Sequence, residues 1–378
     1  MKKLLSTLLL FIAITQNATA LENTTCKKCH PTIFAEYKSS IHAKASIFKD
    51  VVHKAVWDKH PAKPKNNYKC AKCHTPSDHD LISGKSKLAD NEIQQSEPIS
   101  CKACHTIKSI EEHAKANKNK FTKKEKYFYS ANPEKKGTKV VFKEESSFFG
   151  MLKKKVGSPY HDIDYANENY YNGNVCMGCH SHKQNGKGFV ICDLEVVQGD
   201  SKETCVSCHM QKIQGTIANQ VHTATHSFHG ISIHNATPKE LSKYIKLSLE
   251  KTTNGFEVAI KNEATHTLFP QPLRLNQLRV SIERAGKTIA LKTESFAKVI
   301  GRNGKPAMPW LANAVISDTS IKAHETRKVS YTDALQKGDT VIIKFGYFMV
   351  NPKAAKKLEI TNKGVTKFIV LTKKRVTI

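Results

Sequence analysis

Ten of the eleven cysteines in this 378-residue chain fall into five copies of one pattern, Cys-x-x-Cys-His. Two thiols on one helical turn can add to the two vinyl groups along one edge of a porphyrin, and the next histidine then lies beneath the iron. The pattern therefore predicts five covalently attached haem c groups. Disulfides and zinc knuckles explain it less well, because neither demands a histidine after every second cysteine.

The eighteen histidines divide into predicted proximal ligands and a pool from which distal ligands must come. The proximal ligands are His30, His74, His105, His180 and His209, and the haem-binding thiols are those of Cys26, Cys29, Cys70, Cys73, Cys101, Cys104, Cys176, Cys179, Cys205 and Cys208. Methionine is a poor distal ligand here, since Met210 directly follows a proximal histidine. The remaining cysteine, Cys192, is predicted to be a small buried hydrophobe, with a reactive or ligating thiol as the alternative.

The first twenty residues are typical of a secretory signal peptide. Lys2 and Lys3 precede an apolar stretch from Leu4 to Ile14, and Ala18-Thr-Ala20 forms a cleavage site. No apolar run approaches the roughly 20 residues of a membrane span. Haem is attached to thiols outside the cytoplasm, so we expect residues 1–20 to be removed and the mature chain to be periplasmic.

The motifs predict two domains after the signal peptide. All five lie between Cys26 and His209, which places a pentahaem domain at residues 21–236 and a second domain at 237–378. The first is expected to be α-helical and rich in loops, with helices near 33–45, 45–59 and 109–117. The long gap before the fourth motif is expected to form a solvated loop or a flap over one haem.

From residue 241 onward the pattern changes to period-two alternation, which predicts β-strands. Asn254-Gly255 and Ala285-Gly286 separate pairs of runs as hairpin turns. The runs are 245–249, 256–260, 278–282, 288–291, 328–331, 340–345 and 367–371. Such a series favours an all-β, immunoglobulin-like sandwich, with a partly open barrel as the alternative.

Four stretches beyond the motifs resemble periplasmic multihaem cytochromes c related to the cytochrome c-554 family, in the variant with a β-sandwich after the haem domain. They are Tyr37-Lys-Ser-Ser-Ile-His42; Ser158-Pro-Tyr-His161; Cys205 to Met210 followed by His226-Ser-Phe-His229-Gly230; and Asp318-Thr-Ser-Ile with Glu325-Thr-Arg-Lys-Val. The resemblance, together with position, implies that His42, His113, His161 and His226 are distal ligands. Related sandwiches have Gly-His and Pro-x-Gly where this chain has Thr265-His266 and Pro270-Gln-Pro, so no ligand role is predicted for His266.

Charge is unevenly distributed along the chain. Residues 21–236 carry a net +10, which about two carboxylates per haem would roughly cancel, whereas residues 237–378 carry a net +15 with no cofactor to offset it. An acidic redox partner or an anionic membrane surface fits this basic region, and nucleic acid is excluded by export. Lysine-rich codon usage is the plain alternative.

Two functions remain open at this stage. The first is an electron carrier that passes electrons between periplasmic redox partners, with the β-domain as a docking module. The second is an oxidoreductase acting on a small nitrogen or sulfur compound at a five-coordinate haem. Pentahaem nitrite reductases resemble the second option in haem count, but they use a lysine where all five motifs here have histidine. The carrier is therefore preferred, and no catalytic residue is predicted.

Overall fold

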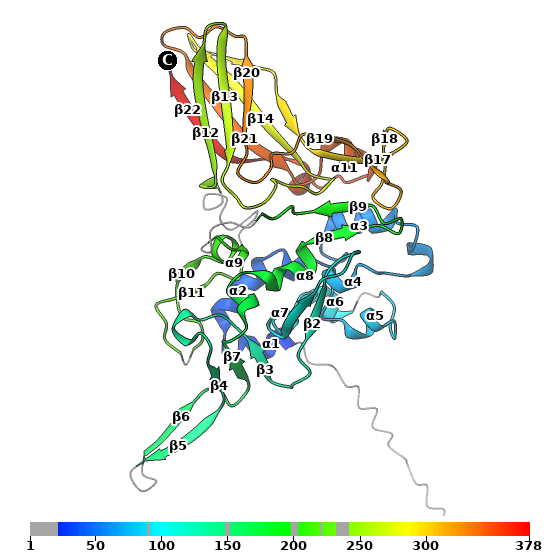
Figure 1. Cartoon of the computed structure of the whole chain (residues 1–378), viewed down its shortest axis with the longest axis vertical. Helices are drawn as coiled ribbons and strands as arrows, with labels where there is room; N and C mark the ends of the chain where they lie inside the picture. Colours follow the sequence, from blue (N-terminus) through cyan, green and yellow to red (C-terminus); the bar gives the residue numbers. More distant parts are fainter. Residues whose placement is uncertain (1–21, 89–90, 148–151, 198–202, 220, 232–241) are drawn as a thin grey trace, which may run out of the picture.

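The computed structural model describes residues 22–88, 91–147, 152–197, 203–219, 221–231 and 242–378. Short helices and hairpins lie at one end of the molecule, and long antiparallel strands lie at the other (Figure 1). We call these the N-terminal region (residues 22–231) and the C-terminal region (residues 242–378). The expected boundary near residue 237 falls outside the described residues.

Helices of the N-terminal region are short, and most of them carry or flank a haem motif. They are α1 (Glu22–Lys27), α2 (Pro31–Ser39), α3 (Val51–Asp58), α4 (Ala71–His74), α5 (His79–Ser83), α6 (Glu92–Ser96), α7 (Cys101–His105), α8 (Met177–His180) and α9 (Cys205–His209). Helix α3 begins after Asp50, whose side chain accepts hydrogen bonds from the N–H groups of Val52 and His53. This cap is the reason that the predicted helices 33–45 and 45–59 are separated: α2 ends at Ser39, and a 3-10 turn at His42–Lys44 follows.

The N-terminal region also contains more β-structure than the sequence predicted. Its strands are β1 (Ile107–Glu111), β2 (Lys118–Phe121), β3 (Tyr127–Tyr129), β4 (Lys139–Val140), β5 (Lys143–Ser147), β6 (Leu152–Val156), β7 (Asp162–Asp164), β8 (His182–Gln184), β9 (Val190–Asp193), β10 (Lys212–Gln214) and β11 (Thr225–Ser227). Four antiparallel pairs form, β1–β2, β5–β6, β8–β9 and β10–β11, together with a sheet of order β3-β7-β4. The expectation of an α-helical domain therefore holds only in part.

The predicted helix at 109–117 is wrong. Residues 107–111 form β1, which pairs with β2 in the register Ile110↔Asn119 and Glu111↔Lys118. The pairing brings Lys118 and Lys120 to the carboxylate of Glu111. These are contacts across a hairpin, so the helical spacing of apolar residues in one segment could not reveal them.

The C-terminal region consists of long strands that follow the predicted alternation. They are β12 (Ile245–Thr252), β13 (Gly255–Asn262), β14 (Leu275–Arg284), β15 (Lys287–Ala290), β16 (Glu294–Phe296), β17 (Lys298–Arg302), β18 (Lys305–Pro306), β19 (Ala314–Asp318), β20 (Thr326–Tyr331), β21 (Thr340–Phe348) and β22 (Phe368–Thr377), with helices α11 (Pro352–Lys357) and α12 (Lys363–Thr366). One sheet has the order β12-β13-β20, another has the order β15-β14-β21-β22 with β16 also paired to β14, and β18-β17-β19 forms a third.

The main core of the chain lies between the first two of these sheets. Phe256, Val258 and Ile260 on β13 are fully buried in the same cluster as Leu278 on β14 and Phe345 on β21. The Ala285-Gly286 turn joins β14 to β15 with both residues at positive φ, as a type I′ hairpin requires. Alternation in the sequence thus predicted seven strands of this region, β12 to β15 and β20 to β22. It did not predict β16 to β19 or the two helices.

The two regions are joined by polar contacts around the end of the haem-motif segment. The Asn185 amide donates to the carbonyl oxygens of Pro309 and Ala312 at 2.9 and 2.7 Å. The Glu195 carboxylate accepts from Lys298 and Lys322 of the C-terminal region at 3.0 and 2.8 Å. These bonds hold the β8–β9 pair and the chain that follows it against the C-terminal strands.

Candidate haem-binding sites

Each Cys-x-x-Cys-His motif occupies a single helical turn. In the first motif the backbone N–H of His30 donates to the carbonyl of Cys26 at 2.8 Å, and the other motifs coincide with α4, α7, η5 (Asn174–Cys176) with α8, and α9. All the motif thiols are free cysteines and at least partly accessible. This geometry places both thiols and the following imidazole on one side of a turn, as thioether attachment to a porphyrin requires.

Four proximal histidines each face a second imidazole across a gap. The ring centres are separated by 6.1 Å for His30 and His161, 6.0 Å for His42 and His180, 6.2 Å for His105 and His229, and 6.3 Å for His209 and His266. An iron bonded to two imidazole nitrogens at about 2 Å each puts the ring centres about 6 Å apart. The four pairs therefore fit the haem iron that the motifs imply.

Backbone carbonyl groups orient many of these rings through the nitrogen that faces away from the partner. Nδ1 of His30 lies 2.8 Å from the carbonyl oxygen of Ile217, and Nδ1 of His105 lies 2.8 Å from that of Tyr129. His229 and His266 make the same kind of contact, with the carbonyl oxygens of Ser227 at 2.7 Å and Thr267 at 3.0 Å. A hydrogen on Nδ1 leaves the Nε2 lone pair available to a metal, so these bonds select the binding tautomer.

Burial favours the neutral form of five of the paired imidazoles. Desolvation, with smaller contributions from the neighbouring His180 and His74, lowers the pKa of His42 to about 4. Burial likewise lowers the pKa of His229 to about 4, with a smaller contribution from His105. The pKa values of His105, His161 and His180 are also lowered, chiefly by burial. Neutral imidazole is the form that donates its lone pair to iron.

Two of the histidines that the sequence singled out as distal ligands, His42 and His161, lie opposite proximal histidines. The structure places the other two, His113 and His226, against different groups. Nδ1 of His113 accepts from the N–H of Lys115 at 3.1 Å. His226 is almost fully buried, with Nε2 2.7 Å from the Glu36 carboxylate and Nδ1 3.1 Å from the carbonyl oxygen of Gly215.

Glu36 explains why His229 takes the place expected for His226. One carboxylate oxygen of Glu36 contacts the His226 ring, and the other accepts from the backbone N–H of His229 at 2.9 Å. His226 thus holds the strand while His229, three residues later, reaches His105. The sequence did carry both histidines of this segment, but nothing local distinguishes them, because the choice depends on a carboxylate on α2.

The position of His266 also differs from the sequence prediction, which gave this histidine no ligand role. It belongs to the C-terminal region, follows β13, and lies 6.3 Å from the ring of His209 on α9. His266 therefore lies opposite the proximal histidine of the fifth motif, although the sequence around Thr265 and Pro270 departs from the related pattern. A backbone bond from Val197 to the carbonyl of Thr265, 2.8 Å long, fixes the loop that presents it.

The second motif has different surroundings. The rings of His74 and His53 lie only 3.8 Å apart, too close to accommodate an iron between them, and both Nδ1 atoms face the carbonyl oxygen of Ala45. Tyr68 approaches Nε2 of His53 at 3.3 Å. Among the residues that the structure describes, no imidazole faces His74 at the spacing of the other four pairs.

Thiols of different motifs meet in pairs. The Cys101 thiol contacts that of Cys26, which raises the pKa of Cys101. The thiols of Cys179 and Cys73 contact each other in the same way, as do those of Cys176 and Cys205. The first motif is therefore adjacent to the third, and the fourth is adjacent to both the second and the fifth.

Cys192, the cysteine outside the motifs, lies on β9. Burial raises the pKa of its thiol to about 11, so the protonated thiol predominates at neutral pH. The sequence predicted a small buried hydrophobe, and the side chain is only partly buried.

The chain is similar to one family model and to one solved structure. Residues 25–106 match the family model described as cytochrome c554 and c-prime. The fold is similar to that of a penta-heme cytochrome c552 from Thermochromatium tepidum, with a TM-score of 0.70 and 20% sequence identity over 95% of this chain and 99% of that chain. Among the curated proteins, no match was found.

The five motifs, the imidazole pairs and these similarities define a multihaem cytochrome c. Within that class, residues 25–106, which hold the first three motifs, are similar to the c554 family. No helix in the described ranges combines the length and hydropathy that crossing a bilayer demands.

Proposed function

We propose that this chain is a pentahaem electron carrier that works in the periplasm after removal of residues 1–20. The haems supply one-electron iron chemistry when bound, and the chain's own residues hold them, orient them and set their ligand fields. His42, His161, His229 and His266 are the proposed distal ligands, opposite His180, His30, His105 and His209. The observation that carries the proposal is the spacing of 6.0 to 6.3 Å in all four pairs.

Imidazole on both faces of an iron leaves no open position for a substrate, so these four sites suit electron transfer rather than catalysis. The thiol contacts between motifs support short distances between neighbouring haems. They connect the first site to the third, and the fourth to the second and fifth. Closely spaced haems with imidazole on both faces of each iron are suited to passing electrons from one haem to the next.

A matched pair of variants tests the ligand assignment. His229→Ala should convert one haem to the high-spin state and let it bind carbon monoxide when reduced, whereas His226→Gln, which keeps a hydrogen-bonding side chain beside Glu36, should leave all spin states unchanged. Electron paramagnetic resonance and absorption spectra of the holoprotein report both outcomes. The reverse pattern would restore His226 as the ligand, and a response to His113→Ala would restore His113.

A second candidate function rests on the different geometry at His74. An iron bound there without a facing imidazole would be five-coordinate and open to a small nitrogen or sulfur compound. Nitrite, hydroxylamine and sulfite, each mixed with the reduced or oxidised holoprotein, separate the two functions. A carrier reacts slowly and without turnover, whereas sustained turnover that is lost with changes at His53 or Tyr68 would favour the enzyme. Mass spectrometry of the mature chain should at the same time show five covalent haems.

We propose an acidic redox partner for the basic C-terminal region. If its net +15 steers association, electron exchange should slow steeply as salt rises, since the Debye length falls from about 10 Å at 0.1 M to about 3 Å at 1 M. Changing Lys356, Lys357, Lys373 and Lys374 to Glu should lower the rate and flatten its salt dependence without altering haem spectra. A rate insensitive to both would leave these lysines as ordinary solvated surface.

A further inference from the structure

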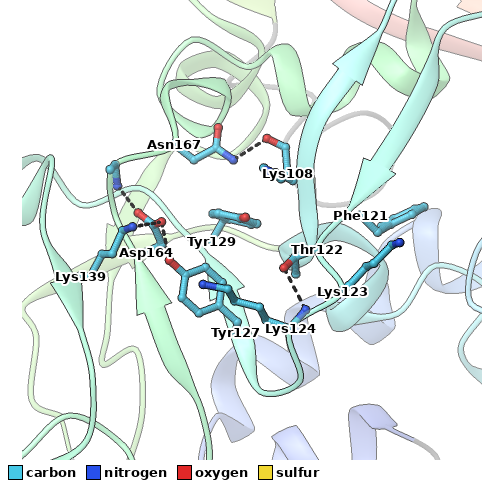
Figure 2. Close-up of a pocket in the computed structure, with 11 residues that line it drawn as sticks. Lys108, Phe121, Thr122, Lys123, Lys124, Tyr127, Tyr129, Lys139, Asp164 and Asn167 are labelled. Atoms are coloured by element: carbon cyan, nitrogen blue, oxygen red, sulfur yellow. Dashed lines mark hydrogen bonds and ion pairs between the residues drawn. The ribbon is translucent and has the colours of Figure 1, made fainter.

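Behind the third motif lies an open pocket of about 640 Å³ that no haem-binding residue lines. The β1–β2 hairpin, the β3-β7-β4 sheet and the segment after β7 form its walls (Figure 2). Its volume falls within the range of about 300 to 1,000 Å³ that is typical of small-molecule sites. Nδ1 of His105 lies 2.8 Å from the backbone carbonyl oxygen of Tyr129, which lines the pocket, so the pocket adjoins the proximal histidine of the third motif.

The lining of this pocket is strongly basic. Lys108, Lys123, Lys124 and Lys139 surround a single carboxylate, that of Asp164, which leaves an excess of three positive charges (four minus one). Figure 2 shows Lys108, Lys139 and the adjacent Lys123 and Lys124 around one opening. An anionic ligand would be attracted by this concentration of positive charge.

Asp164 does not neutralise the lysines, because other groups already engage it. It accepts hydrogen bonds from the Tyr127 hydroxyl and the Ala166 N–H, both at 2.7 Å, and its ion pair with Lys139 is long at 3.6 Å. In the parts of the chain that are described, Lys108, Lys123 and Lys124 have no carboxylate within ion-pair distance. No carboxylate therefore neutralises these three lysines, although Nζ of Lys124 lies over the Tyr127 ring, 5.0 Å from its centre.

Aromatic rings form the rest of the lining and lead toward His105. Tyr127 and Tyr129 line the pocket with ring centres 5.5 Å apart. The ring centre of Tyr129 lies 6.0 Å from that of Tyr170, and the ring centre of Tyr170 lies 6.2 Å from that of His105. The Tyr129 carbonyl also accepts directly from His105 at 2.8 Å. A ligand in the pocket would thus be connected to the proximal ligand of the third haem by packed rings and one hydrogen bond.

From these observations we propose that the pocket binds a planar aromatic polyanion of the quinone class, which delivers electrons to the third haem. The proposal rests on the electron-carrier function. The reduced ligand, a hydroquinone, would lose two electrons to two ferric haems in successive one-electron steps and release two protons, forming the quinone and two ferrous haems. Lysines would hold its negative substituents, and the tyrosine rings would pack against its plane.

Binding is tested separately from electron transfer, using oxidised anthraquinone-2,6-disulfonate and the oxidised holoprotein. We expect calorimetry to show one site whose dissociation constant rises about tenfold or more in the triple variant Lys108→Gln, Lys123→Gln, Lys124→Gln, because three charges are lost. The matched control Lys65→Gln, Lys85→Gln, Lys87→Gln removes the same charge from exposed lysines elsewhere and should bind within about twofold of the wild type.

Competition defines the ligand class. Sulfate alone should displace the quinone disulfonate only at far higher concentration, and equal competition would overturn the planar class in favour of a simple inorganic anion. The proposed site would be wrong if both triple variants weakened binding of the quinone disulfonate equally, or if the wild type did not bind it.

Stopped-flow mixing with the reduced form of the same probe then tests delivery. The pocket variant should slow haem reduction in proportion to its weaker binding, whereas reduction by dithionite should be unchanged in every variant. Binding without this slowing would overturn electron delivery through the pocket. Failure of dithionite to reduce the wild-type haems would instead count against the carrier function itself.

Discussion

The two regions of this molecule differ in how much apolar core they contain. In the C-terminal region, one cluster of large apolar side chains, including Phe256, Ile260 and Phe345, fills the space between two sheets. In the N-terminal region the helices are four to nine residues long, and the main apolar cluster consists of five buried residues around Trp57 and Tyr68. Short elements with so small a core need another source of order, and the proposed covalent haems, held between histidines from distant segments, would supply it.

The largest expected effect separates the two regions outright. When the chain is produced without haem attachment, we expect the N-terminal region to lose its fixed structure and the C-terminal region to keep it. Limited proteolysis followed by mass spectrometry should recover a resistant fragment close to residues 242–378. Equal resistance of both regions would show that haem is not the main source of order at the N-terminal end.

The next effect probes the apolar core. Phe345 is fully buried on β21, so Phe345→Ala should reduce the free energy of unfolding of the C-terminal region by about 3 to 5 kcal/mol. Haem absorption should not change. Val315→Ala is the control, because this side chain on β19 is 46% exposed and its loss should cost within about 0.5 kcal/mol. Denaturant titration by circular dichroism measures both, and similar values would contradict the comparison.

A smaller effect concerns the point where the regions meet. His266→Ala should open one iron of five, giving a partial high-spin signal and partial carbon monoxide binding, and should loosen the C-terminal region from α9. His324→Ala serves as control, because this histidine of the same region is exposed. An unchanged spectrum in His266→Ala would support the expectation from sequence that His266 is not a ligand.

The smallest effect is a pH dependence confined to the C-terminal region. Arg284 binds both carboxylate oxygens of Asp339, at 2.8 and 2.7 Å, and lowers the pKa of Asp339 to about 2. A carboxyl whose folded pKa lies below its unfolded value of about 4 stabilises the fold above that pH and loses this contribution as pH falls toward 2. Melting temperatures at pH 6 and pH 3 should therefore differ more in the wild type than in Asp339→Asn.

Sequence was sufficient wherever a local pattern carries the information. The motifs form single helical turns because spacing within five residues determines them, and Phe256 to Ile260 alternate because one face of β13 is buried. The segment 109–117 was misassigned because β1 owes its form to pairing with Lys118 and Asn119. Tertiary pairing overrode local periodicity there.

Distal histidines were harder to predict for a related reason. Glu36 on α2 contacts the ring of His226 but the backbone of His229, and His266, which lies in the C-terminal region, meets His209 of α9. Such choices depend on contacts between segments far apart in sequence. A single sequence predicts the proximal half of each pair and leaves the distal half to the fold.

Under the proposed export and ligand assignment, the pairing of histidines also sets an order of events during secretion. His30 and His105 each meet a partner encoded two motifs later, His161 and His229, and His42 must wait for His180. A chain that emerges from its N-terminus therefore carries newly attached haems with one face exposed until later segments arrive. The translocating chain would pass through a series of reactive, half-ligated forms, and only arrival of His266 would close the last pair.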